Sequence, residues 1–122
     1  MQDEWTRSGE IGARLTDDGA LEICCDGLTT QAKYYKPLLR EFFRRDFAPL
    51  QPGRGDYAVH IRMDHIGDPP WMDLDNLAKA LLDSVVGYVF EDDRQVARLL
   101  VERRPGDREG IWMRVEALAA ES

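Results

Sequence analysis

The segment from residue 57 to residue 87 constrains the fold more than any other part of the chain. Large apolar side chains stand at every second position from Tyr57 to Met63, which predicts a strand with one buried face. A loop with glycine and two prolines follows, and apolar residues then recur at helical spacing from about Asp75 to Val86. Gly87 stands where a helix of this length would end. A strand followed by a loop and an amphipathic helix predicts a helical layer packed on a sheet.

The other predicted elements flank this unit. Alternating residues predict a hairpin of strands 11–15 and 21–25 around Asp17-Asp18-Gly19. A helix is predicted from Pro37 to about Phe47, and two final strands at 95–104 and 111–118. The order is therefore ββαβαββ, an α+β fold in which two helices pack on one face of a mixed sheet. We expect a single domain over residues 1–122, with residues 1–9 flexible.

The composition limits the function. A chain of 122 residues has room for one core, and 16 Lys and Arg against 23 Asp and Glu give a net charge of −7. That charge argues against a protein that coats nucleic acid without sequence preference, although a local basic surface or a metal-neutralised site remains compatible with it. No apolar run could span a bilayer, and the N-terminus lacks a signal-peptide pattern. We expect a cytoplasmic protein without membrane contact.

Cysteine and histidine are not predicted to carry chemistry. Cys24 and Cys25 are adjacent in a predicted strand, so their side chains point to opposite faces and a mutual disulfide is not expected. His60 lies in a strand and His65 begins a loop, and neither has a partner at metal-ligand spacing. All four are interpreted as structural residues.

One stretch is basic although the chain as a whole is acidic. Between positions 33 and 45 five cations stand against one acid, Glu41, which makes the first helix the candidate surface for a phosphate backbone. The alternative is an ordinary solvated helix face. A second, smaller excess of arginine lies between positions 94 and 104. The predicted nucleic-acid contacts are Lys33, Lys36, Arg40 and Arg44.

Carboxylates gather around the second helix. Asp73 and Asp75 stand at its start, Lys79 lies one turn further on, and Asp92 and Asp93 follow the helix. We expect a short loop after the helix to bring the second pair back within reach of the first. Carboxylates that converge without a cation repel one another, and the usual relief of this repulsion is Mg²⁺, which prefers oxygen ligands. A nearby lysine could then stabilise transition-state charge. Each piece has a simpler interpretation: a helix cap at Asp75, an ion pair at Lys79 and a surface turn at 91–93.

Taken together, these pieces form a longer pattern. It consists of DLDNLAKALLD at residues 73–83, Gly87, and DDRQV at residues 92–96. The pattern, the chain length and the element order resemble the RusA family of Holliday junction resolvases. The resemblance implies a Mg²⁺-dependent homodimeric endonuclease, with Mn²⁺ also possible, that cuts four-way DNA junctions by paired symmetric nicks and needs no organic cofactor.

The resemblance also implies roles for individual residues. Asp73, Asp75 and Asp93 would be metal-binding carboxylates, with Asp92 as a further candidate ligand beside them, and Lys79 would be catalytic. Asn76 and Asp83 would support the helix and the lysine. Separately, Trp71 precedes the aspartates, where an aromatic ring could stack on opened bases; packing in the core is the alternative.

Three other functions remain open from the sequence. The chain could be a junction- or DNA-binding protein of the same fold with weak or no nuclease activity. It could instead be a metal-dependent phosphoesterase acting on another branched nucleic acid or on small nucleotides, since the same metal chemistry serves several substrates. A purely structural or interaction protein is the third, and the motif argues against it.

Overall fold

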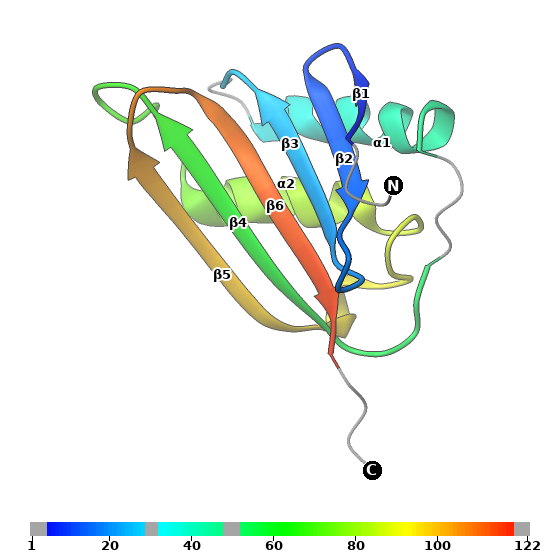
Figure 1. The fold of residues 1–122 in the computed structure, drawn as a ribbon. Coiled ribbons are helices and arrows are strands. Elements are labelled where there is room, and N and C mark those ends of the chain that lie inside the picture. Colours follow the sequence, from blue (N-terminus) through cyan, green and yellow to red (C-terminus); the bar gives the residue numbers. More distant parts are fainter. Residues whose placement is uncertain (1–4, 29–31, 48–51, 119–122) are drawn as a thin grey trace.

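The computed structural model describes residues 5–28, 32–47 and 52–118 (Figure 1). The helices are α1 (Tyr35–Arg45) and α2 (Leu74–Val85), and short 3₁₀ turns precede α1 (η1, Ala32–Tyr34) and β5 (η2, Asp93–Gln95). The strands are β1 (Thr6–Ser8), β2 (Ile11–Leu15), β3 (Leu21–Asp26), β4 (Tyr57–His65), β5 (Val96–Pro105) and β6 (Gly110–Ala117). The α+β class and the predicted element order are confirmed.

All six strands form one mixed sheet in the order β1-β2-β3-β6-β4-β5. β4 and β5 are parallel, and every other neighbouring pair is antiparallel. The last strand, β6, lies between β3 and β4 in the middle of the sheet. Among the described strands β5 pairs with β4 alone and is therefore an edge strand.

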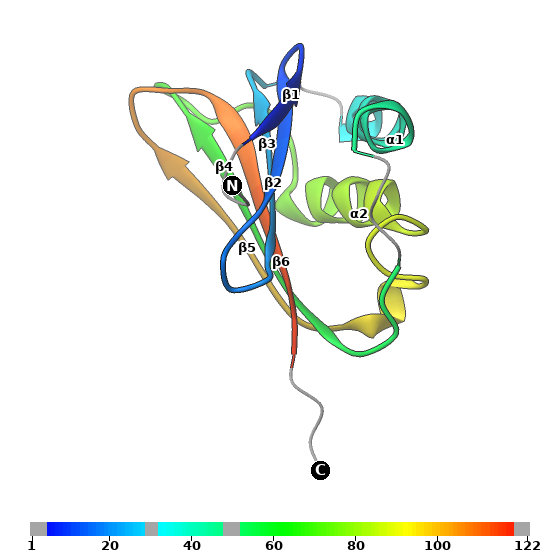
Figure 2. The ribbon, with the colours of Figure 1, turned by 45° about the vertical axis from the view of Figure 1, so that its right-hand side comes forward.

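The two helices lie on the same side of the sheet, as Figure 2 shows. Alternate residues of β4 and β6 are buried beneath them, because side chains of a strand point to opposite faces in turn. The helices contribute the other half of the core, and α1 also packs on α2. The central core residues are Leu39, Phe42, Phe43, Ile61, Met63, Leu77, Leu81, Val85, Phe90 and Met113.

The turns follow the residues predicted to make them. Gly19 in the β2–β3 turn and Gly87 after α2 have φ angles of 86° and 88°, a left-handed conformation that favours glycine. Helix α1 begins two residues before the expected Pro37, which lies in its first turn, where the missing N–H has no partner to lose.

The N-terminal region differs from the expectation of a flexible segment. Residues 1–4 lie outside the described part of the chain, but Thr6–Ser8 forms β1, which pairs with β2 from Thr6 opposite Ala13 to Ser8 opposite Ile11. The Arg7 guanidinium also contacts the Asp26 carboxylate on β3 at 2.7 Å. A strand of only three residues leaves little periodicity in the sequence, so its pairing was not apparent there.

Candidate active site

The first pair of predicted ligands stands at the N-terminus of α2. Asp73 is the N-cap residue in an extended conformation, yet its side chain forms no capping hydrogen bond. Asp75 lies in the first helical turn, and both residues are exposed. The Asn76 amide donates to one Asp73 oxygen at 3.5 Å, whereas Asp75 bonds to no described side chain. The two carboxylates are therefore not used to cap the helix, contrary to the simplest interpretation of Asp75.

Trp71 stands two residues before this pair. Its side chain is 96% exposed, so the interpretation as a core residue is wrong. Met72, between Trp71 and Asp73, instead packs against the hydrophobic core and holds the chain at this point. An aromatic ring thus projects into solvent beside two exposed carboxylates.

Lys79 lies one helical turn after Asp75 on α2. Its side chain is exposed and forms no ion pair with Asp75, Asp83 or any other residue in the described ranges. The alternative interpretation of Lys79 as a partner in a helix-surface ion pair is therefore not supported. Its ammonium group is available to a ligand.

Asp92 and Asp93 lie at the other end of α2. Asp92 accepts a hydrogen bond from the backbone N–H of Arg94 at 2.9 Å and forms an ion pair with its guanidinium. In return the Gln95 amide oxygen accepts from the backbone N–H of Asp92 at 3.0 Å, which completes a capping box around η2. The bonds from Arg94, chiefly that of its backbone N–H, hold the pKa of Asp92 below its ordinary value. Asp92 is thus engaged in local structure, whereas Asp93 is exposed beside it.

The expected return of Asp92 and Asp93 to the first carboxylate pair does not occur within one chain. Helix α2 has 12 residues, which corresponds to about 18 Å between its ends. Because β5 runs parallel to β4, the connection after α2 must return to the start of β4, and Val96 pairs with Tyr57 there. Asp93 therefore lies at the end of α2 opposite Asp73 and Asp75.

Several contacts fix Asp93 in that position. The Gln95 amide donates to the carbonyls of Gly53 and Gly55 at 2.9 and 2.8 Å. Phe90, three residues before Asp93, is fully buried. Moving Asp93 toward the start of α2 would require β5 to separate from β4 and Phe90 to leave the core.

Consequently, the predicted metal-ligand set does not assemble within one chain. Nowhere in the described residues do three or more Asp, Glu, His or Cys side chains lie close enough to hold a metal ion. The exposed Asp73 and Asp75 could supply two oxygen ligands, as Mg²⁺ sites often use one or two carboxylates together with substrate oxygens. The four-carboxylate arrangement expected from the sequence is not present in a single copy.

A mixed-charge pocket lies at the C-terminal end of α2. It has a volume of about 720 Å³, and its lining includes Lys36, Arg40, Asp83, Asp92 and Asp93. Arg40 donates to the carbonyls of Asp83 and Val86 at 3.3 and 3.0 Å and stacks over the Tyr88 ring. Its guanidinium therefore caps α2, because the last carbonyls of a helix lack partners within the helix.

The predicted basic helix is partly neutralised by its own contacts. Besides Arg40, Arg44 pairs with Glu41 at 2.6 Å and Arg45 with the same carboxylate at 3.7 Å. Lys33 lies over the Tyr34 ring, and only Lys36 has no ion pair, hydrogen bond or ring contact with a described residue. Of the four predicted backbone contacts, Lys33 and Lys36 keep ammonium groups without an acidic partner.

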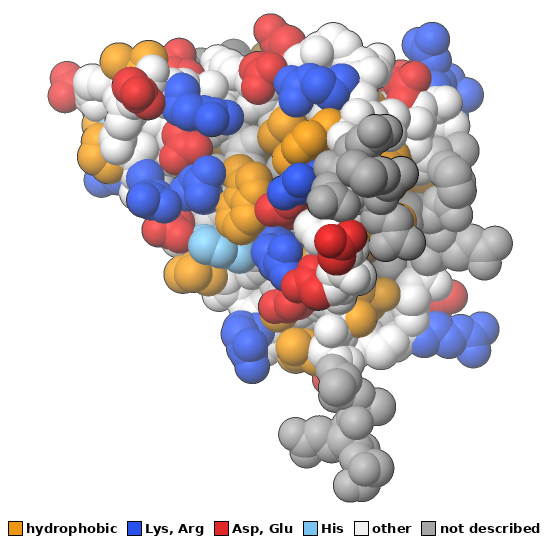
Figure 3. Space-filling model, viewed as in Figure 1, with side chains coloured by type: hydrophobic (Ala, Val, Ile, Leu, Met, Phe, Trp, Pro, Cys, Tyr) orange, Lys and Arg blue, Asp and Glu red, His pale blue; other side chains and the backbone are white. Residues whose placement is uncertain are grey.

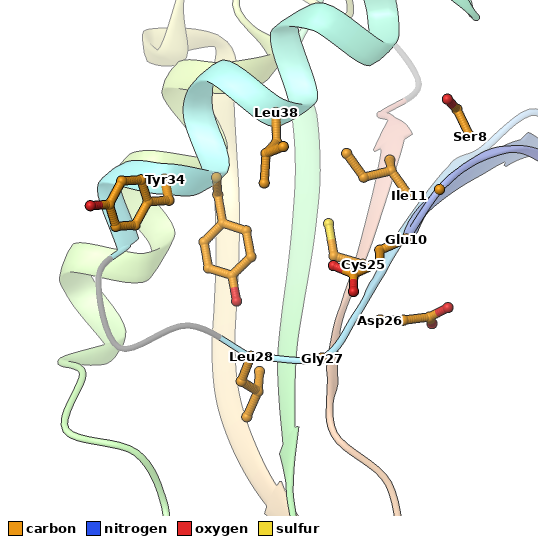
Figure 4. A pocket seen from close by; sticks show the side chains of 11 residues that line it. Ser8, Glu10, Ile11, Cys25, Asp26, Gly27, Leu28, Tyr34 and Leu38 are labelled. Carbon is orange, nitrogen blue, oxygen red and sulfur yellow. The ribbon is translucent and has the colours of Figure 1, made fainter.

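An apolar pocket lies away from these charges. It has a volume of about 450 Å³ and lies between the start of α1 and the ends of β2 and β3 (Figure 4). Tyr34, Leu38 and Ile11 line it together with Cys25, whose thiol pKa is raised to about 12 by burial. A buried, protonated thiol is unreactive, so the structural interpretation of Cys25 agrees with its environment.

The histidines are also satisfied locally. The His60 ring contacts the Glu102 carboxylate and the edge of Trp112, and the His65 Nδ1 is 2.9 Å from the carbonyl oxygen of Gly67. These contacts agree with their exclusion from the metal chemistry.

The fold and the acidic helix define a class of protein: a small α+β domain with exposed carboxylates at a helix N-terminus and a lysine one turn beyond. Comparison with protein-family models gives a match to a family described as endodeoxyribonuclease RusA, over residues 29–116. The chain belongs to this family, which implies nuclease activity of the Holliday junction resolvase kind. A comparison with curated proteins finds no match. No helix in the described ranges is long and apolar enough to cross a bilayer.

Proposed function

We propose that this protein is a metal-dependent, structure-selective endonuclease that resolves four-way DNA junctions by paired symmetric nicks, acting in the cytoplasm during recombination and repair. Family membership supports the nuclease class. The single observation that carries the site is the exposed pair Asp73 and Asp75, whose carboxylates do not cap the helix they begin. Exposed acids that do not cap the helix are suited to a divalent cation, which takes one or two carboxylates together with substrate oxygens.

In this proposal Asp73 and Asp75 hold Mg²⁺, and Mn²⁺ could replace it. The metal would polarise a phosphate oxygen and activate water. Lys79 projects from the same helix one turn further on, and its unpaired ammonium would stabilise the additional negative charge that develops on the phosphate during attack. Trp71 would stack on bases exposed at the junction centre.

The third carboxylate is proposed to come from a second copy of the chain. Within one chain Asp93 is fixed at the wrong end of α2, about a helix length from Asp75. A two-fold homodimer with antiparallel α2 helices would place Asp93 of each copy near Asp73 and Asp75 of the other, which gives two equivalent sites. Between the two candidates we choose Asp93, because Asp92 is engaged in capping η2.

Cleavage of a synthetic four-way junction tests this function. The reactions would contain Mg²⁺, Mn²⁺ or a chelator, with a linear duplex of the same sequence and an Asp75→Asn variant as controls. We expect paired nicks that need metal, spare the duplex and disappear in the variant. Tight junction binding without cleavage under any metal would support the DNA-binding alternative. Equal cutting of junction and duplex would contradict the proposal that the four-way junction is the preferred substrate.

A further inference from the structure

Arginines without acidic partners gather on the edge strand β5. Arg7, Arg14, Arg44, Arg45, Arg62, Arg94 and Arg114 all pair with acids, and Arg40 binds helix carbonyls. In contrast, Arg98, Arg103 and Arg104 are exposed and form no ion pair or hydrogen bond with any described residue. The same holds for Arg54 and Arg108, but each of these lies singly in a loop. These three residues, called the β5 arginines below, lie within one ten-residue strand.

The acids near these arginines do not neutralise them. Glu102, the acid within β5, is held by the His60 ring of the neighbouring strand. Asp64, which pairs in register with Arg104, is bound by the Arg62 guanidinium at 3.1 Å. Asp107 and Glu109 belong to the β5–β6 turn, where Arg108 lies between them. The strand itself therefore keeps an excess of positive charge in a chain whose net charge is −7.

The position of β5 makes this charge accessible. The strand is at the edge of the sheet, so one side of its backbone has no neighbouring strand among the described residues. The register with β4 places Arg98 and Arg104 on the open face of the sheet and Arg103 on the helix face. Figure 3, which views the open face, shows Lys and Arg side chains exposed along the side formed by β4 and β5.

Two of the β5 arginines, Arg103 and Arg104, also lie toward the candidate site, whereas Arg98 lies near the start of β4. Arg103 and Arg104 pair in register with Met63 and Asp64 at the end of β4, and the backbone N–H of Gly106 bonds to the carbonyl of His65 at 2.8 Å. From His65 the chain continues directly through Trp71 to Asp73. The three arginines thus lead along one edge of the sheet to the end of the molecule where α2 begins (Figure 1).

We infer that the β5 arginines bind the phosphate backbone of a duplex arm of the DNA substrate. Arg98 and Arg104 are six residues apart, about 20 Å along a strand. Over that length a duplex presents on the order of ten phosphates, enough for each guanidinium to find one. Exposed, delocalised guanidinium groups are suited to such contacts, and the paired arginines of α1 are not. This inference rests on the proposed function and names the surface through which its substrate is held.

The test is a salt titration of junction binding in Ca²⁺, with cleavage in Mg²⁺ measured in parallel. A triple variant, Arg98→Gln, Arg103→Gln and Arg104→Gln, is compared with a charge-matched control, Arg7→Gln, Arg45→Gln and Arg114→Gln, whose arginines have acidic partners. If all three β5 arginines bind phosphate, the slope of log K against log salt becomes shallower by about 2.7 in the first variant. The control keeps the parent slope.

Further arms separate the possible failures. The lysine version of the triple variant retains the positive charge and should keep the parent slope. A single Arg104→Gln should make the slope shallower by about 0.9, and this variant tests the inference even if the triple variant does not fold. A parent slope in the glutamine variants, while the parent binds and cuts the junction, overturns the inference and leaves the nuclease proposal standing. A parent protein that neither binds nor cuts DNA overturns both.

Discussion

The two ends of helix α2 carry similar residues but use them differently. At the N-terminal end, Asp73 and Asp75 are exposed and bond to nothing that the helix needs. At the C-terminal end, Asp92 caps η2, and Arg40 satisfies the last carbonyls of α2. The comparison shows that a charged residue of the motif is available to bind a ligand only where its side chain does not already form a structural hydrogen bond or ion pair.

The largest expected effect separates the two ends directly. Asp75→Asn should lower the rate of junction cleavage by on the order of 10²–10³-fold, because it removes a carboxylate that is proposed to hold the metal. Asp83→Asn, which changes the same residue type two turns along the helix, should lower it far less. Single-turnover cleavage with saturating protein measures both variants, and binding in Ca²⁺ serves as the folding control. Equal losses in the two variants would contradict the distinction between the ends.

Mixing two inactive variants tests whether the ends meet between copies. Asp75→Asn and Asp93→Asn chains, mixed and allowed to exchange, should recover about one quarter of the wild-type sites, since half of the dimers are mixed and each mixed dimer has one intact site. The products should be single nicks rather than paired ones. Gel analysis of a labelled junction distinguishes the two. No recovery, with exchange shown by mass spectrometry of mixed dimers, would place Asp75 and Asp93 in the same chain's site.

Arg40 should affect stability and not DNA binding. Arg40→Gln removes a donor to two helix carbonyls and a ring contact, so we expect a loss of about 1–2 kcal/mol in the free energy of unfolding. Urea denaturation measures it, with Lys36→Gln in the same pocket as the control that should change little. A shallower salt dependence of junction binding with unchanged stability would instead return Arg40 to the DNA contacts expected from the sequence.

The smallest effect is the pH dependence of the η2 cap. The pKa of Asp92 is lowered in the folded state from its ordinary value of 3.8, so its carboxylate stabilises the fold above that value and loses this contribution as the pH falls through the lowered pKa. The difference in thermal unfolding midpoint between wild type and Asp92→Asn should therefore be greatest near neutral pH. It should shrink below about pH 4. A difference that grows on acidification would contradict the assignment.

Much of the fold was predictable because its signals are local. The alternation in β4 and the apolar stripe of α2 report burial on one face, and Gly87 marks the end of that helix with a φ angle that other residues rarely adopt. The ends of the predicted elements differ from the observed ones by only a residue or two. Strand β1 was missed because three exposed residues contain no such pattern.

The site was less predictable because its geometry depends on pairing between distant segments. The predicted strand–helix–strand order favours a parallel β4–β5 pair, and that direction places Asp93 at the far end of α2, whereas the expected meeting of the carboxylates was based on the short loop alone. The partners of Arg40 lie more than 40 positions along the chain, so its capping role could not be found from the helix alone. The exposure of Trp71 was also undetermined, because an aromatic residue at a helix entry suits the core equally well.

The central place of β6 means that the last strand in the chain joins the two parts of the sheet. Without β6, the described strands fall into two groups, β1-β2-β3 and β4-β5, that share no ladder hydrogen bonds. Residues 110–117 lie between these groups and pair with both. Such long-range pairing is slow, and the unpaired edges stay exposed to aggregation until it is complete. A chain that ends before β6 would therefore lose the strand that joins the two parts of its sheet. A chain without β5 would lose only an edge strand.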